Sequence, residues 1–236
     1  MTHNSNNERL QQRERWFAPF LLSTLLPILV APFTNMGGNL AQQMLLPLSV
    51  VIMVLIAARI IPNDLLEIGS WKPYRLYRPW AALCCCLMGL PYLLGEHMTQ
   101  GLHALILSII SSFYLATAIA LVLILAKVHR VNEAVLCLGA AGYVHLGLTG
   151  GQLATALEML RPGSFNLGRM LHGQELVERL SYFSFVTVGT LGYGDVLPTT
   201  TEAESFSVLL SATGALYVTL IIGLLLSRYI TTKQQH

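Results

Sequence analysis

The chain has 236 residues, 54% of them hydrophobic and only 11% charged, with a formal net charge of +2. Soluble domains carry about 25% charged residues, so this composition excludes an ordinary soluble domain and favours an integral membrane protein. We expect no nucleic-acid partner.

Six long apolar segments follow one another along the chain: Trp16–Phe33, Leu40–Ile61, Trp80–Leu94, Leu102–Ala126, Ala134–Leu157 and Phe206–Ser227. A helix needs about 20 apolar residues to cross the hydrocarbon, so we interpret them as six transmembrane spans, the third being the shortest. A half-apolar segment at Glu178–Gly189 is too short to span. It predicts a re-entrant pore helix, and the expected fold class is an all-α integral membrane protein with a pore helix and a filter loop.

Basic residues are concentrated in alternate loops, and the loops after spans 1 and 3 have none. Since Lys and Arg stay on the cytoplasmic side, we predict a multi-pass protein of the cell membrane with both termini cytoplasmic. The segment Glu158–Ser205 then faces outward. The prediction rests on Arg9, Arg13, Arg15, Arg59, Lys72, Arg75, Arg78, Lys127, Arg130, Arg228 and Lys233.

The outward segment is acidic, with six acidic and three basic residues and a net charge of −3 per chain. Such a collar would concentrate cations at an outer mouth. A solvated loop that happens to be acidic is the alternative.

The spans divide the chain into four predicted parts. These are a cytoplasmic N-terminal segment (1–15), a four-helix membrane domain (16–130), a pore domain (131–230) and a short cytoplasmic tail (231–236). We interpret the first apolar segment as a retained span, because no small-x-small cleavage site is clear.

Several residues within the spans are interpreted as packing residues. The glycines of span 5 permit close helix approach, and His145 is favoured as a hydrogen-bonded packing residue over a proton sensor. The cysteines have no histidine beside them, so we expect no metal centre. They are Cys84, Cys85, Cys86 and Cys137.

The most informative motif is Thr190-Leu191-Gly192-Tyr193-Gly194. Backbone carbonyls replace the water around K⁺ only if successive carbonyls point to one side. An ordinary strand alternates its carbonyls, so some residues must adopt unusual φ/ψ, as Gly192 and Gly194 can at little steric cost. Thr190 adds a hydroxyl oxygen, Tyr193 would point away from the ions, and a complete ring needs several chains. A plain turn between two helices is the alternative.

The longer motif Tyr-Phe-Ser-Phe-Val-Thr-x-x-Thr-Leu-Gly-Tyr-Gly-Asp-x-x-Pro begins at Tyr182. It resembles the tetrameric potassium-channel superfamily, in particular bacterial six-span channels with one pore loop per subunit. The resemblance covers Leu180–Ile230 and is weak or absent over spans 1–4. It implies a homotetramer in the lipid bilayer, with K⁺ as permeant ion and no cofactor. The ion sites would be the carbonyls of Thr190, Leu191, Gly192 and Tyr193, with the Thr190 hydroxyl.

The resemblance also implies roles around this filter. Asp195 would lie just outside it, tied down by an aromatic donor on the pore helix, where Tyr182 stands in place of the usual Trp. Gly189 replaces a Thr common in relatives and would loosen the base of the filter. Gly214 falls at the position of a hinge glycine in span 6, with close helix packing as the alternative.

Below Gly214, Val218, Ile222 and Leu226 recur every four residues on one face of span 6. Four copies of this stripe would form apolar rings able to gate by dewetting, although plain helix packing gives the same pattern. The pore helix would point its C-terminal end, near Val188, at the cavity under the filter. Each helix dipole places about half an elementary negative charge there.

Span 4 has no Lys or Arg, and spans 1 and 3 have no acidic countercharges. Voltage sensing needs several charges inside the membrane field, so we expect no conventional voltage gating.

The sequence therefore predicts a potassium-selective channel that conducts K⁺ passively through a homotetrameric pore, and not an enzyme. A weakly selective monovalent cation channel is the alternative, if Gly189 and Leu191 loosen the filter. An ion-coupled transporter would need four loops with degenerate filters. An intramembrane enzyme would need ionisable groups at depth, and a structural adaptor leaves the motif unexplained.

Overall fold

The computed structural model describes residues 14–34, 44–62, 73–94, 100–128, 131–171 and 173–234. Most of these residues are helical. In chain order the elements are α2 (Phe17–Thr34), α4 (Leu45–Ile60), η1 (Pro73–Leu76), α5 (Tyr77–Leu94), α6 (Gln100–Lys127), α7 (Glu133–Leu160), β1 (Phe165–Asn166), α8 (Gly173–Val188), β2 (Leu197–Pro198), α9 (Thr201–Leu216), η3 (Tyr217–Ile222) and α10 (Gly223–Gln234).

Every predicted span overlaps a helix of the described residues, and the last overlaps the continuous run α9–η3–α10. Two helical stretches, Gly101–Lys127 and Glu133–Leu160, are long and apolar enough to cross a membrane. Phe17–Phe33 and Leu45–Ile60 are shorter apolar helices, so the count of six spans stays a prediction. Most of the predicted N-terminal segment 1–15 lies outside the described residues, as do Arg9, Arg13, Lys72 and Arg130 of the orientation argument.

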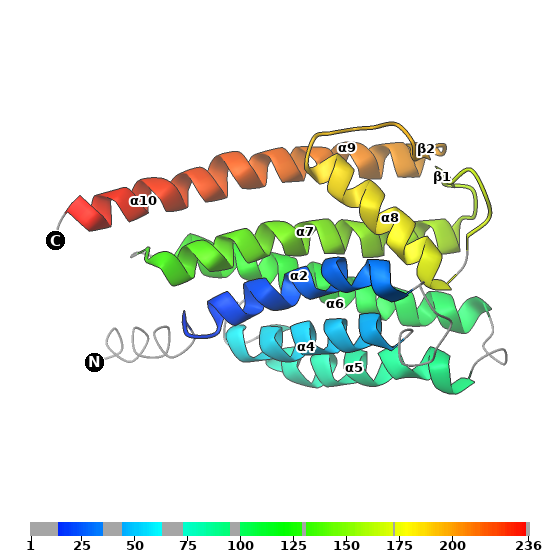
Figure 1. Ribbon diagram of the computed structural model, residues 1–236, viewed down its shortest axis with the longest axis horizontal. Helices are drawn as coiled ribbons and strands as arrows, with labels where there is room; N and C mark the ends of the chain where they lie inside the picture. The colour runs from blue at the N-terminus through cyan, green and yellow to red at the C-terminus, as the bar shows by residue number, and fades with distance from the viewer. Residues whose placement is uncertain are drawn as a thin grey trace.

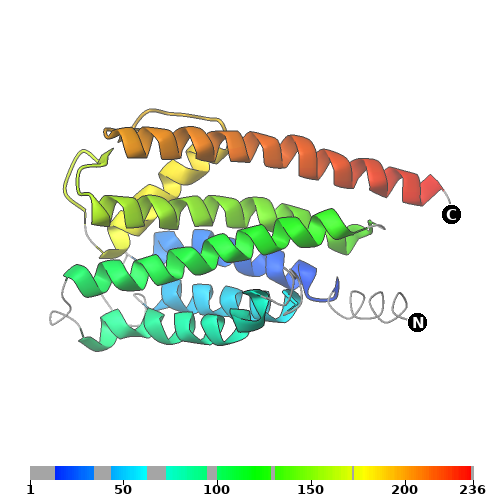
Figure 2. The same ribbon diagram turned by 180° about the vertical axis from the view of Figure 1, so that it is seen from behind.

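Helix α7 is at the centre of the molecule. It packs against α6 and α2 on one side and against α8 and α9 on the other, while α4 and α5 lie farther out beyond α2 and α6 (Figures 1 and 2). The Asn132 side chain begins α7 by accepting a hydrogen bond from the Val135 N–H at 3.0 Å, as an N-cap residue does. Because α7 contacts both groups of helices, the predicted division at residue 130 does not coincide with a gap in packing.

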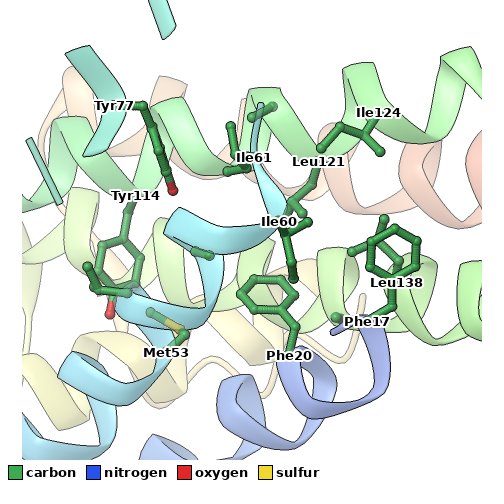
Figure 3. Close-up of a cluster of buried hydrophobic side chains, with 14 of the residues drawn as sticks. Phe17, Phe20, Met53, Ile60, Ile61, Tyr77, Tyr114, Leu121, Ile124 and Leu138 are labelled. Carbon is green, nitrogen blue, oxygen red and sulfur yellow. The ribbon is translucent and has the colours of Figure 1, made fainter. Parts of the chain in front are cut away.

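A large apolar core joins the N-terminal helices to α7. Phe17, Phe20 and Ile60 are almost fully buried within it and lie near Leu138 of α7 (Figure 3). His145 is completely buried, stacks on the Tyr114 ring at 5.2 Å between centroids, and has its Nε2 atom 3.2 Å from the Tyr114 carbonyl oxygen. These contacts are those of the hydrogen-bonded packing residue that the sequence favoured.

Glycines bring α7 and α8 close together, as predicted for span 5. The Ser184 hydroxyl of α8 donates to the Gly147 carbonyl oxygen of α7 at 2.7 Å. A Cβ atom on Gly151 would lie 2.7 Å from the Ser181 Cα atom of α8, which is a backbone atom and has no rotamer by which to move away. The absence of a side chain at residue 151 is therefore a condition for this helix contact.

We predict that Gly151→Ala lowers the free energy of unfolding by about 1–3 kcal/mol, the usual cost of overpacking. The measurement is the melting temperature of the purified protein in detergent. Gly89→Ala is the matched control, because a Cβ there meets nothing within 4 Å. Alanine should stabilise that helical position by up to about 1 kcal/mol. Equal melting temperatures for the two variants would contradict the close-contact account.

Candidate functional site

The C-terminal turn of α8 lies between α7 and α9. The Tyr143 hydroxyl of α7 donates to the Val188 carbonyl oxygen at 3.3 Å. From the other side, a Cβ atom on Gly214 of α9 would lie 2.6 Å from the same oxygen. Both neighbours therefore hold the end of α8, which determines where the following segment Thr190–Gly194 begins.

Helix α8 ends in a Schellman motif. The Leu191 N–H donates to the Val186 carbonyl oxygen at 2.9 Å, and the Thr190 N–H donates to the Thr187 carbonyl oxygen at 3.1 Å. This pattern requires a left-handed residue after the helix, a position that is usually glycine. Here it is Thr190, with φ of 58°, the one non-glycine residue with positive φ among the described residues. A β-branched residue in this conformation costs about 1–2 kcal/mol, which marks the position as strained.

Left-handed residues alternate with others through this segment. Thr190 (φ 58°), Gly192 (φ 56°) and Gly194 (φ 77°) have positive φ, whereas Leu191 and Tyr193 do not. The two glycines thus adopt the unusual conformation expected of them. In an ordinary strand every φ is negative, and successive backbone carbonyl groups face opposite sides. The alternating sign of φ therefore distinguishes this segment from an ordinary strand.

Among the described residues, backbone N–H groups of the segment Thr190–Gly194 form hydrogen bonds within the chain, whereas its carbonyl oxygens do not. The N–H groups of Thr190, Leu191 and Gly192 all donate to carbonyl oxygens in the last turn of α8. The carbonyl oxygens of residues 190–194 accept no hydrogen bond from the described part of the chain. All five residues are exposed in the single chain. Since backbone carbonyls require a partner, this row of oxygens is free for water or a cation.

Asp195, directly after the segment, is held by Arg179 of α8. An Arg179 Nη2 atom lies 3.2 Å from the Asp195 Oδ2 atom and also donates to the Asp195 carbonyl oxygen at 3.2 Å. The guanidinium carbon lies 5.3 Å from the centroid of the Tyr182 ring. Tyr182 is thus beside the predicted support residue Asp195, with Arg179 as the partner that the sequence analysis missed. Sixteen positions separate Arg179 from Asp195, so no local pattern indicates this pair.

A short antiparallel pair ties the segment's outer end to the loop before α8. Phe165 of β1 pairs with Pro198 of β2, and the Thr199 N–H donates to the Ser164 carbonyl oxygen at 2.9 Å. The Glu158 carboxylate accepts from the N–H groups of Gly163 at 2.8 Å and Phe165 at 2.9 Å. A carboxylate just before an Arg-Pro-Gly-Ser turn is a signal for this role that the sequence analysis overlooked.

Half of the carboxylates of the acidic collar form ion pairs with its arginines. Its three arginines pair with three of its carboxylates: Arg161 with Glu202, Arg169 with Glu175, and Arg179 with Asp195. The hydrogen bond from its own backbone N–H, and next the Arg161 guanidinium, lower the pKa of Glu202. The other three carboxylates of the collar are those of Glu158, Glu178 and Glu204.

The long last helix contains an irregularity. Tyr217–Ile222 is a π-helix, a rare geometry that is frequent at functional sites. Val218 and Leu226 are exposed, whereas Ile222 is partly buried, with its Cδ1 atom 3.8 Å from where a Cβ on Gly139 would lie. The three predicted gate residues therefore do not share one exposed face in this structure.

The predicted hinge glycine lies just before this π-helix. Gly214 is in the α-helical part of the run and is packed against Val188, which matches the packing alternative. The hinge and the gate stay predictions. Gly189 follows α8 directly, and its N–H donates to the Phe185 carbonyl oxygen at 2.8 Å.

The cysteines and metal-ligating side chains add no second site. All four cysteines are free, and Cys84 is buried in the apolar core. Within the described ranges, no group of three His, Cys, Asp or Glu side chains could hold a metal ion.

Comparison with known families gives one match. A family model described as "Ion channel" matches residues 165–231, from β1 through α8, the Thr190–Gly194 segment and α9 into α10. Comparisons with curated proteins and with solved structures give no match. The matched residues include the strained segment, α8 before it and Gly214 of α9, whereas Tyr143 and Glu158 lie outside the match. The match supports an ion channel.

Proposed function

We propose that this chain is the subunit of a homotetrameric potassium-selective channel, with Thr190–Gly194 as the selectivity filter. One observation carries the proposal: the N–H groups at the start of the segment are bonded to α8, and its carbonyl oxygens have no partner in the described residues. Unpaired carbonyls in a row, beside a strained threonine, suit a cation that has lost its water.

The need for several copies follows from the same geometry. One chain presents one exposed row of oxygens, whereas replacing a hydration shell requires oxygens on all sides. The continuous helical run α9–η3–α10 also exposes large apolar side chains, which need lipid or another chain to cover them. They are Val208, Leu209, Leu216, Val218, Leu226 and Ile230.

The orientation proposed is a multi-pass protein of the cell membrane with both termini cytoplasmic. Helix α2 begins and α10 ends at the same end of the molecule, opposite β1 and β2 (Figure 1). The basic residues that begin or end helices there agree with a cytoplasmic side, among them Arg15, Arg59, Arg75, Arg78 and Lys127.

Conduction would be passive and would not depend on a conventional voltage sensor. Helix α6, the position of a voltage-sensing helix in six-span channels, has its one basic residue, Lys127, in its last turn. Each charge that crosses the field contributes about 2.3 kcal/mol per 100 mV, so a helix without charges inside the membrane contributes nothing.

The first prediction concerns the ion. The purified protein in K⁺-loaded vesicles should give K⁺ flux that Ba²⁺ blocks, with much lower Na⁺ flux in the same preparation, because filter carbonyls coordinate a dehydrated K⁺. Protein-free vesicles are the control. Equal K⁺ and Na⁺ flux would instead indicate a weakly selective cation channel.

The second prediction concerns the backbone of the filter. Gly192→Ala should abolish K⁺ flux without preventing assembly, since alanine disfavours φ of 56° by about 1–2 kcal/mol. Steric overlap is not the cause, because a Cβ atom at residue 192 would have no neighbour within 4 Å. Gly168→Ala is the matched control, with φ of 74° and equally open surroundings. It should lose similar stability and keep its flux, and normal flux in Gly192→Ala would remove the filter assignment.

The third prediction concerns the strain at Thr190. Glycine has no steric penalty at positive φ, so Thr190→Gly should leave the melting temperature unchanged or higher while lowering the ratio of K⁺ to Na⁺ flux. Thr190→Ser keeps the hydroxyl and should keep more of the selectivity. A Thr190→Gly channel as selective as the native one would show that the hydroxyl takes no part.

A further inference from the structure

Two arginines flank one tryptophan at the end of the molecule where α2 begins. The guanidinium carbon of Arg15 lies 5.9 Å from the centroid of the Trp16 ring, and that of Arg59 lies 5.0 Å from it. Arg15 precedes α2, and Arg59 is in the last turn of α4. The antiparallel packing of α2 and α4 thus gathers two cations from distant parts of the sequence around one aromatic ring.

Buried neighbours hold this cluster in place. Phe17, next to Trp16, and Ile60, next to Arg59, are 2% and 1% exposed within the apolar core (Figure 3). Both arginines are exposed, and Trp16 is partly buried. The two guanidinium groups therefore lie beside the Trp16 ring on backbone positions that the core fixes, which reduces the conformational entropy lost when they bind a ligand.

The cluster brings two positive charges to one aromatic ring. Within the described residues neither Arg15 nor Arg59 forms an ion pair. The neighbouring acidic groups are Glu14, whose carboxylate accepts from the Asn132 amide at 2.8 Å, and Glu133 in the first turn of α7. An anion that accepts hydrogen bonds from guanidinium groups, such as a phosphate, is the ligand class that matches this charge.

An apolar surface continues from each arginine. On α4, Arg59, Leu55, Ile52 and Leu48 are spaced four, three and four residues apart and are all exposed, so they form one stripe along the helix. On α2, exposed Leu22 and Leu29 lie farther along from Arg15. An anionic group on an acyl chain fits a cation followed by an apolar stripe, whereas a free phosphate would leave the stripe uncovered.

We propose that Arg15, Trp16 and Arg59 form a binding site for the phosphate group of an anionic phospholipid in the cytoplasmic leaflet. The guanidinium groups hold the phosphate, the indole lies at the interface between headgroups and acyl chains, and a chain runs along the Leu48–Leu55 stripe of α4. The proposal rests on the membrane embedding and orientation in the proposed function, and it is independent of K⁺ selectivity.

The test is native mass spectrometry of the full-length protein in detergent, titrated with phosphatidylglycerol or with phosphatidylcholine of the same acyl chains. We expect preferential retention of phosphatidylglycerol. One basic residue near an anionic surface contributes enough to change affinity about five-fold, so the double variant Arg15→Gln/Arg59→Gln should lose more than ten-fold in affinity. Trp16→Leu keeps both charges and should lose part of the preference, because the ring no longer positions them.

The matched control is Arg75→Gln/Arg78→Gln, which removes two exposed arginines at the same end of the molecule but outside the cluster. Its retention of phosphatidylglycerol should be close to that of the native protein. Native-like retention in Arg15→Gln/Arg59→Gln, or an equal loss in the control, would overturn the site. Displacement of the lipid by equimolar glycerol phosphate would assign the cluster to a free phosphate instead of a lipid.

Two further measurements separate the causes of failure. Unchanged melting temperatures of the variants show that a loss of lipid is not a loss of fold. K⁺ flux from the same preparations tests the channel independently, so a non-conducting protein that retains phosphatidylglycerol would contradict the proposed function and leave the lipid site standing.

Discussion

The contact of the last turn of α8 with α7 and α9 is the constraint on which the rest of the site depends. The Val188 carbonyl oxygen accepts a hydrogen bond from the Tyr143 hydroxyl on one side. On the other side it faces the backbone of Gly214, which has no side chain. A larger residue at 214 would have to displace backbone, so neither α8 nor α9 can shift alone. The start of the Thr190–Gly194 segment is therefore fixed by packing before any ion or second chain is considered.

The same turn explains why strain is tolerated. Termination of α8 requires a left-handed residue, and glycine would supply it without cost. A threonine there is costly, because a φ of 58° is unfavourable for a β-branched residue. Strain that the fold does not need is expected where a side chain serves function. Thr190 thus both caps the C-terminal end of α8 and supplies the first oxygen of the proposed filter.

Much of this architecture could be predicted because apolar runs and glycines act locally. The runs located the helices, and the glycines of α7 predicted a close helix approach, which in the structure is with α8. The stripe of Val218, Ile222 and Leu226 assumed an α-helical period, which the π-helix at Tyr217–Ile222 changes. The bond between Arg179 and Asp195 and the pairing of β1 with β2 depend on tertiary structure and leave no periodic pattern. The last helix continues to Gln234, into the predicted tail 231–236. The tail was predicted from its polar residues, and it contains no residue that breaks a helix.

The π-helix Tyr217–Ile222 contacts residues that hold the start of the proposed filter. The Tyr217 hydroxyl donates to the Gly139 carbonyl oxygen of α7 at 2.8 Å, and its ring lies 6.0 Å from that of Tyr143, which in turn bonds Val188. A return of Tyr217–Ile222 to α-helical geometry would rotate α10 relative to α9, because a π-helix has more residues per turn. During that rotation, the hydrogen bond between the Tyr217 hydroxyl and the Gly139 carbonyl oxygen would either persist or break. The residues that hold the start of the proposed filter are therefore in contact with residues that such a rotation would move.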